Sequence, residues 1–193
     1  MRPRQDEERI YEAALQLFAA YGYKKTTLED IARELGMTGA NLYSYANSKQ
    51  ALYHNCVAYA LNKWQTYVRD SINGIEDSCE YFTSLCRCSI EYLGQDDAFR
   101  QILKRDPDIF PMFPEADPYE EINSLSFLML KNALDRGVSD GSFAPVDTEK
   151  TTRILFSVYK TLIIESYIRE DEDSVMEIFP ATMDLIMRGL LRR

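Results

Sequence analysis

The chain is poor in metal-binding side chains of the usual zinc type. It has 193 residues, a single histidine and only four cysteines, which supply a Cys/His zinc site poorly. Two of the cysteines are two positions apart, a spacing that places them on different faces of a helix. We therefore expect no metal and no cofactor, and we expect small core thiols at Cys56, Cys79, Cys86 and Cys88.

Long apolar runs and irregular segments are also scarce. No run approaches the roughly 18 uninterrupted apolar residues that a membrane span needs. The segment MRPRQDEER has no apolar stretch behind its positive charges, so we expect no secretory signal. Seven Pro, eight Gly and 46% apolar residues are typical of a folded protein with few long loops. These features predict a cytoplasmic protein with no membrane partner.

Catalytic signatures are missing as well. The sequence contains no Gly-rich phosphate loop, no nucleophile motif and no histidine other than His54. We therefore expect no catalytic residues, and the enzyme class is the least favoured of the functions considered.

The chain has no excess of positive charge, and its charged residues are unevenly distributed. The chain has a formal charge of -9, while residues 1–50 hold seven Lys/Arg and seven Asp/Glu and are therefore neutral. The acidity belongs to the remaining three-quarters of the chain. Because phosphate contacts act within a Debye length of the surface, a neutral, locally basic head can still bind DNA in front of an acidic body.

Apolar residues recur at spacings of three and four along most of the chain, and no useful strand-like alternation occurs. Four prolines between residues 106 and 118 interrupt the pattern. Pro180 is expected to kink the last helix. The sequence thus predicts an all-α protein of about nine helices, at 5–21, 28–35, 38–43, 48–73, 77–93, 96–105, 119–137, 147–167 and 174–191.

Two short helices with a tight turn between them follow the first helix. Residues 27–30 read TLED, a capping-box pattern at the start of a helix that Gly36 ends. Thr38 then caps a third short helix running through Tyr43, and Ser48 caps a long fourth helix. Helix, tight turn and short helix is the sequence form of a helix-turn-helix.

Residues 27–52, TLEDIARELGMTGANLYSYANSKQAL, resemble the signature region of the TetR family of repressors. The apolar stripe of the first helix and the later Asp140-Gly141-x-Phe143 turn are similar to family members too. The resemblance implies a three-helix DNA-binding head, residues 1–50, and a C-terminal ligand-binding and dimerisation bundle, residues 51–193. It also implies three partners: a double-stranded DNA operator, a small-molecule effector and a second copy of the chain.

The head offers a set of candidate DNA contacts. Slim residues at the start of the third helix suit a major groove about 12 Å wide, where Asn41 can bond a base edge. Tyr43 and Tyr45 can reach phosphates, and Lys49 lies where a helix N-terminus favours a phosphate. The predicted contacts are Thr27, Thr38, Gly39, Ala40, Asn41, Tyr43, Tyr45 and Lys49.

Several basic and capping residues keep two interpretations. Thr27 and Ser48 also serve as plain helix caps, and Lys24 and Lys25 fit a solvated turn or a DNA patch. An arm formed by the first residues, Arg2 and Arg4, is a further candidate contact with the duplex.

One position departs from the family pattern. Ala46 stands where the family usually has an aromatic residue that packs the third helix against the first and fourth. The lost apolar area costs on the order of 1–3 kcal/mol unless neighbours such as Tyr21, Tyr23 and Tyr53 fill the space. This departure bears on the rigidity of the DNA-reading head.

The C-terminal part carries the signals of a partner and a ligand. Residues 151–168 are apolar on more than one face, which predicts packing against their own bundle and against a second copy of the chain. Aromatic residues in the central helices form either a plain core or the wall of a ligand pocket. The pocket candidates are Trp64, Tyr67, Phe82, Tyr92, Phe127 and Tyr159.

Two acidic residues and a Pro-rich segment are further candidates for the pocket. Glu91 and Glu165 face either a ligand or solvent, and the Pro-rich segment with Ile109, Phe110, Met112 and Phe113 is a candidate pocket wall. The predicted function is a ligand-responsive repressor that a small molecule releases from a palindromic operator when the fourth helix pivots. The alternative is a helical small-molecule-binding protein that has lost specific DNA binding.

Overall fold

The computed structural model describes residues 4–106, 109, 117–163 and 172–191, and these residues form an all-helical protein, as the sequence predicts. None of the helices in these ranges combines the length and apolar character needed to cross a bilayer. The helices are α1 (Arg4–Tyr21), α2 (Leu28–Glu34), α3 (Gly39–Leu42), α4 (Lys49–Ser71), α5 (Ser78–Gln95), α6 (Asp97–Arg105), α7 (Glu120–Ser139), α8 (Thr148–Ile163) and α9 (Glu172–Leu190).

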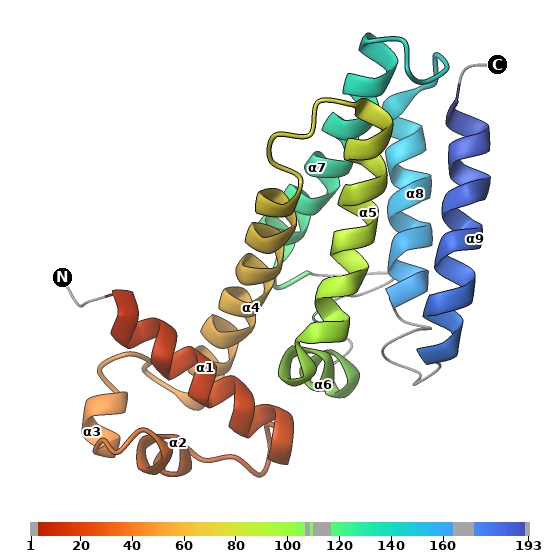
Figure 1. The fold of residues 1–193 in the computed structure, drawn as a ribbon. Coiled ribbons are helices and arrows are strands. Elements are labelled where there is room, and N and C mark those ends of the chain that lie inside the picture. The colour runs from red at the N-terminus through yellow and green to blue at the C-terminus, as the bar shows by residue number, and fades with distance from the viewer. Residues whose placement is uncertain (1–3, 107–108, 110–116, 164–171, 192–193) are drawn as a thin grey trace.

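The first three helices form a small head at one end of the molecule (Figure 1). Side-chain caps begin its short helices, where isolated turns would otherwise fray. Thr27 and Asp30 form the predicted capping box of α2, and the Thr38 hydroxyl accepts from the Asn41 N–H at 3.3 Å to start α3. Gly36 has φ +65°, a left-handed conformation that turns the chain between α2 and α3.

Helix α4 connects the head to the body. The Ser48 hydroxyl caps it by accepting from the Ala51 N–H at 3.1 Å, and the helix then continues for 23 residues. At 1.5 Å per residue it is about 34 Å long. Its first part packs on α1 and its later part on α5 and α7, so one rigid element belongs to both regions.

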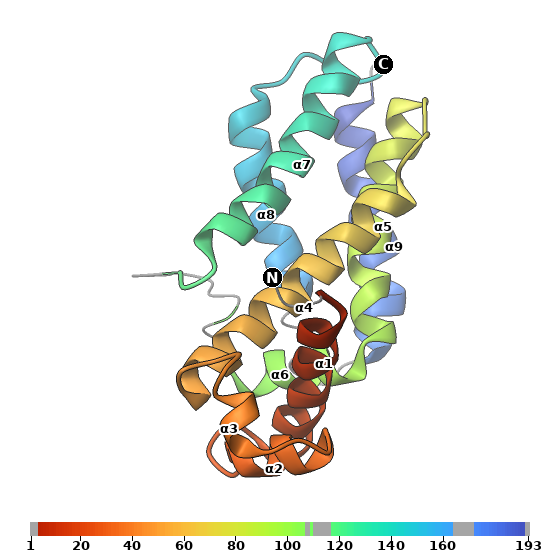
Figure 2. The ribbon, with the colours of Figure 1, turned by 90° about the vertical axis from the view of Figure 1, so that its left-hand side faces the viewer.

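The body consists of α5, α7, α8 and α9 beside the far end of α4, while α6 lies crosswise between the body and α1 (Figures 1 and 2). Helix α6 packs on both α1 and α5. Helix α9 remains helical on both sides of Pro180; the predicted kink there stays a prediction.

The turn between α7 and α8 packs tightly against the body. Gly141 adopts φ +82°, and Phe143 then turns inward, 1% exposed, with its ring edge against Phe82. The Phe143 ring packs directly over the Cα of Gly137, where a β-carbon would collide with it. The Ala144 N–H donates to the Leu190 carbonyl at 2.7 Å, which ties the turn to α9.

Candidate DNA-binding head and ligand cavity

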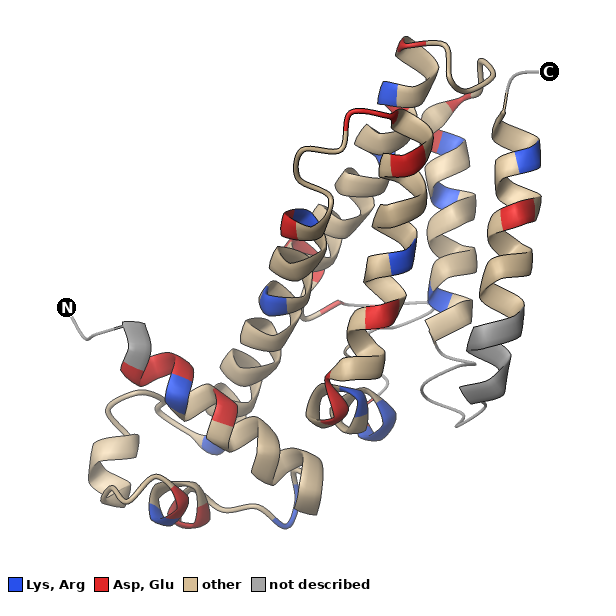
Figure 3. Cartoon of the chain, viewed as in Figure 1, with Lys and Arg blue, Asp and Glu red and all other residues tan. Residues whose placement is uncertain are grey.

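The outer face of α3 is open to solvent. Thr38, Ala40 and Asn41 are exposed, Gly39 is half-exposed, and Leu42 on the opposite side is completely buried. The four-residue helix carries no charged side chain (Figure 3). Buried Leu42 therefore fixes α3 to the head, while its slim N-terminal residues are presented outward, which is the arrangement that entry into a major groove requires.

The two tyrosines after α3 differ in exposure. Tyr43 is 49% exposed and directs its ring away from the core, whereas Tyr45 is half-buried against it. Thr27, at the start of α2, is exposed, but its hydroxyl donates to Asp30 Oδ2 at 2.6 Å and accepts from the Asp30 N–H. A phosphate contact at Thr27 would therefore compete with the capping box.

Lys49 has an internal role in addition to its predicted phosphate contact. Its ammonium donates to the carbonyl oxygens of Tyr23 at 2.9 Å and Thr26 at 3.2 Å, and lies 4.4 Å from the Tyr23 ring centroid. These contacts tie the start of α4 to the loop between α1 and α2. The predicted DNA contact at Lys49 stays a prediction, and no local sequence pattern indicates this internal bond.

Ala46 is buried, and three aromatic rings of the head pack against one another. Phe18, Tyr23 and Tyr53 form a triangle with ring centroids 5.0–6.0 Å apart. Tyr21 is 62% exposed and does not join this cluster. Of the three tyrosines named as possible fillers, Tyr23 and Tyr53 thus supply aromatic packing between α1 and α4.

The basic residues outside these helices keep their two interpretations. Lys24 and Lys25 are exposed in the turn after α1. Arg2 and the side chain of Arg4 lie outside the described part of the chain, so the N-terminal arm stays a prediction.

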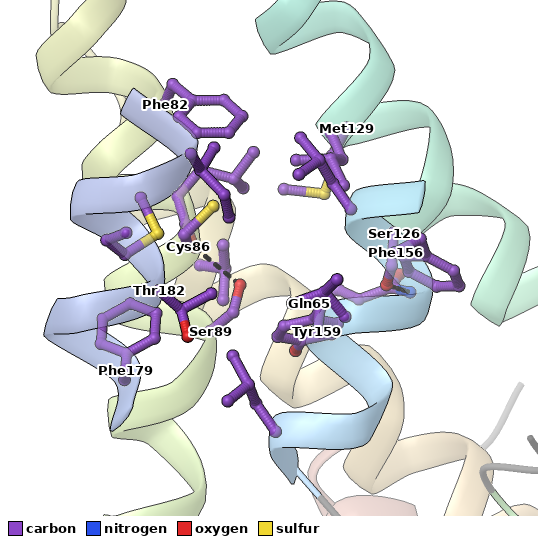
Figure 4. A pocket seen from close by; sticks show the side chains of 18 of the residues that line it. Gln65, Phe82, Cys86, Ser89, Ser126, Met129, Phe156, Tyr159, Phe179 and Thr182 are labelled. Carbon is purple, nitrogen blue, oxygen red and sulfur yellow. Dashed lines mark hydrogen bonds between the residues drawn. The ribbon is translucent and has the colours of Figure 1, made fainter. Parts of the chain in front are cut away.

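A largely apolar cavity opens between α4, α5, α7, α8 and α9 (Figure 4). Its empty space is about 840 Å³, a figure that includes the part open to solvent. Phe82 and Met129 contribute at one end, and Phe156, Tyr159 and Phe179 contribute further along. An apolar wall with a few polar side chains is typical of a small-molecule site.

Three of the six predicted pocket residues line this cavity: Trp64, Phe82 and Tyr159. The other three lie outside its wall because they pack against neighbouring rings or helices. The Tyr67 and Tyr92 ring centroids are 5.2 Å apart, and the Tyr92 hydroxyl donates to Asp96 Oδ2 at the start of α6. Phe127 meets the far side of Phe156 edge to face, with 5.7 Å between ring centroids.

The polar lining residues were missed by the aromatic criterion. They are Gln65, Ser89, Asn123, Ser126 and Thr182. Helical spacing could have found some of them, because Ser89 lies seven positions after Phe82 and Ser126 lies three before Met129, on the same faces. The thiol of Cys86 also faces the cavity, and burial raises its pKa to about 12.

The acidic candidates do not enter the described lining. Glu91 is exposed and its carboxylate pairs with Arg87 at 3.3 Å on the outer side of α5. Its surroundings therefore correspond to the solvent-facing alternative. Glu165, Phe110, Met112 and Phe113 lie outside the described residues, and Ile109 is buried.

An exposed short helix behind a tight turn, carried by a long helix that also walls an apolar cavity, defines a helix-turn-helix DNA-binding protein with an attached small-molecule site. Residues 10–56 match the family of bacterial regulatory proteins, tetR family. The chain is 26% identical over 144 residues to the HTH-type transcriptional repressor KstR2 of Mycolicibacterium smegmatis, covering 75% of this chain and 70% of that one.

Solved structures share the fold over nearly the whole chain. A TetR transcription regulator from Haloarcula marismortui superposes with a TM-score of 0.83 and 21% identity, covering 97% of this chain and all of that one. Bacillus subtilis FadR, solved in complex with stearoyl-CoA, superposes with a TM-score of 0.76 and 14% identity, covering 94% and 97%. The match over residues 10–56 and the similarity to KstR2 support a TetR family transcriptional regulator, and the solved structures show the same fold.

Proposed function

We propose that this protein is a repressor that binds a palindromic DNA operator as a homodimer and releases it when a small molecule enters the cavity. The observation that carries the proposal is the course of α4. It begins in the head at Lys49 and contributes Trp64, Gln65 and Val68 to the cavity wall. A ligand that favours a different tilt of α4 would therefore move the head.

The magnitude of such a response depends on differential affinity. A ligand shifts the equilibrium between DNA-binding and released conformers only by the ratio of its affinities for the two. The complex of Bacillus subtilis FadR with stearoyl-CoA supports a ligand site in this type of bundle. As a regulator of chromosomal DNA, the protein would act in the cytoplasm.

A homodimer is supported by uncovered apolar side chains on α8 and α9. Ile154 is 64% exposed and Leu185 is 73% exposed, while Ile178 is 47% exposed. Large exposed apolar side chains on adjacent helices suit an interface between copies. A two-fold axis through this face would place the two α3 helices roughly 34–36 Å apart, one turn of DNA, or slightly more.

The test is a fluorescence-anisotropy titration of the protein with DNA from just upstream of its own gene, at two salt concentrations. We expect saturable nanomolar binding that competitor DNA does not abolish. Asn41→Ala should weaken specific binding by about 1–3 kcal/mol if Asn41 bonds a base edge. Asn62→Ala, a matched change on an exposed turn of α4, should leave binding unchanged.

Two results would contradict the proposal. Equal loss in the Asn41 and Asn62 variants would remove α3 as the reading helix. Weak binding at every sequence, lost with modest salt, would favour the alternative of a small-molecule-binding protein without specific DNA recognition.

A further inference from the structure

One polar pair in the cavity wall has a defined hydrogen-bonding capacity. The Gln65 Nε2 group on α4 donates to the Ile122 carbonyl and to Ser126 Oγ, the latter at 2.8 Å (Figure 4). Because a backbone carbonyl can only accept, the amide nitrogen must face Ile122, which leaves Gln65 Oε1 as an acceptor. The accepting Ser126 oxygen keeps its own proton to donate.

The hydroxyl protons of Ser126 and Ser89, both in the cavity wall, differ in whether they have a hydrogen-bond acceptor. Ser89 donates to the Leu85 carbonyl at 2.7 Å, within its own helix. Among the described residues, the structure assigns Ser126 no such acceptor. Gln65 and Ser126 together therefore offer one acceptor and one donor side by side, which is the complement of a single alcohol group.

The rest of the described wall is uncharged. None of the described lining residues is Asp, Glu, Lys, Arg or His. Two charged groups contact lining residues: the Lys160 ammonium lies 5.2 Å from the Phe156 ring centroid, and Asp117 accepts from Asn123 Nδ2 at 2.8 Å. A charged head group placed among the apolar side chains would lose its hydration without a counter-charge beside it.

We propose that the effector is an uncharged, mainly apolar molecule carrying an alcohol oxygen, which donates to Gln65 Oε1 and accepts from the Ser126 hydroxyl. This inference rests on the proposed function, because it treats the cavity as the effector site. The apolar remainder of the molecule packs against Phe82, Met129 and Met183.

The protein carries its own probe of occupancy. Trp64 is the single tryptophan of the chain and lines the cavity, so its fluorescence reports binding there. We would titrate the full chain with four compounds of equal chain length: 1-decanol, 1-methoxydecane, decanoate and decyltrimethylammonium. Decanol should bind more tightly than either ion by about tenfold or more, since a buried unpaired charge costs more than a paired hydroxyl.

Two variants assign the alcohol to its partners. Gln65→Leu should weaken decanol by about tenfold, the effect of one lost hydrogen bond, and leave the methyl ether unchanged because the ether has no proton to donate. Ser126→Ala should weaken both compounds. Ser157→Ala, a serine on the exposed side of α8, is the matched control and should change neither.

The inference is overturned if decanoate binds more tightly than decanol and Lys160→Met removes that preference, because Lys160 would then hold an anionic head. It is also overturned if none of the four compounds changes Trp64 fluorescence, or if Gln65→Leu weakens the ether as much as the alcohol.

Operator binding, measured in the same samples, distinguishes a failure of the proposed ligand chemistry from a failure of the proposed function. Decanol that occupies the cavity as described and leaves operator affinity unchanged supports the ligand chemistry proposed for the cavity and contradicts the proposed function of the cavity as the effector site. If another compound releases DNA while decanol fails to enter the cavity, the result contradicts the proposed ligand chemistry and supports the proposed function.

Discussion

The head and the body bury their apolar residues in different ways. In the head, short capped helices close around Phe18, Ile31 and Leu42, each fully buried, and the sequence of residues 1–50 holds equal numbers of positive and negative residues. In the body, longer helices enclose a cavity and leave residues such as Ile154 and Leu185 exposed. A DNA-reading head needs one fixed geometry, whereas a sensing body needs internal space and an uncovered face.

Helix α4 belongs to both the head and the body. Its first turn is tied to the head through Lys49, and its later turns line the cavity through Trp64 and Gln65. A charged residue on the body's uncovered face should separate the two copies, and substitutions in the core of each region should show how tightly each core is packed.

The largest effect is expected from Leu185→Glu on the uncovered face of α9. Two carboxylates, one from each copy, would be buried near the two-fold axis without counter-charges, which costs several kcal/mol. We expect a dimer in the parent protein and a folded monomer in the variant, measured by light scattering, with specific operator binding lost. Leu125→Glu on α7, a leucine also about half exposed, should remain dimeric.

Phe18→Ala should be the most damaging change inside the head. It removes a fully buried ring that contacts Tyr23 and Tyr53, so we expect a loss of about 3–5 kcal/mol in unfolding free energy by urea titration. Tyr21→Ala, at a 62% exposed position of the same helix, should stay within about 0.5 kcal/mol of the parent. Equal losses would mean that the head has no closed aromatic core.

Gly137→Ala should be the corresponding test in the body. The added methyl would collide with the Phe143 ring, and we expect a cost of about 1–3 kcal/mol from overpacking. Gly189→Ala in α9 meets nothing within 4 Å, so it should stabilise the protein by about 0.5–1 kcal/mol through lower backbone entropy of the unfolded chain. The melting temperatures of both variants measure these changes in stability. A stabilised Gly137→Ala variant would contradict the close packing of Phe143 on Gly137.

The smallest effect is expected at Asp140, in the turn before Phe143. Hydrogen bonds from the hydroxyl of Ser78 and from Ser142 hold its pKa below the ordinary value of 3.8. The contribution to stability is therefore present above 3.8 and is lost as the pH falls through the lowered folded-state pKa.

Ser78→Ala should reduce the dependence of stability on pH that Asp140 contributes. The variant should be less stable than the parent at neutral pH, and the gap in melting temperature should narrow on acidification. Ser139→Ala, an exposed serine nearby, is the control. A gap that stays constant or widens toward low pH would show that the Ser78 hydroxyl does not act through the Asp140 carboxylate.

Much of the fold could be predicted because its signals are local. The apolar periodicity and the caps at Thr27, Thr38 and Ser48 predict every helix start in the head to within a residue or two, and the structure confirms the all-α class. The outward face of α3 follows from the same pattern, since one apolar residue, Leu42, faces inward among slim neighbours.

The cavity could be predicted only in part. Aromatic content identified Trp64 and Tyr159, but it also selected Tyr67 and Tyr92, whose rings pack against each other instead. Whether an aromatic ring lines a space or fills it depends on the neighbouring helices, which are distant in sequence. Gln65 was missed because a polar residue in an apolar stripe has no distinctive local signal.

The sequence by itself determined the helices, their caps, the helix-turn-helix and the division of charge, because these depend on residues within a few positions of one another. Tertiary structure alone decided that Lys49 bonds the carbonyls of Tyr23 and Thr26, that Gln65 meets Ser126, and that Phe143 closes over Gly137. These contacts join residues separated by several to 61 positions, and only the packing of complete helices brings their atoms within bonding distance.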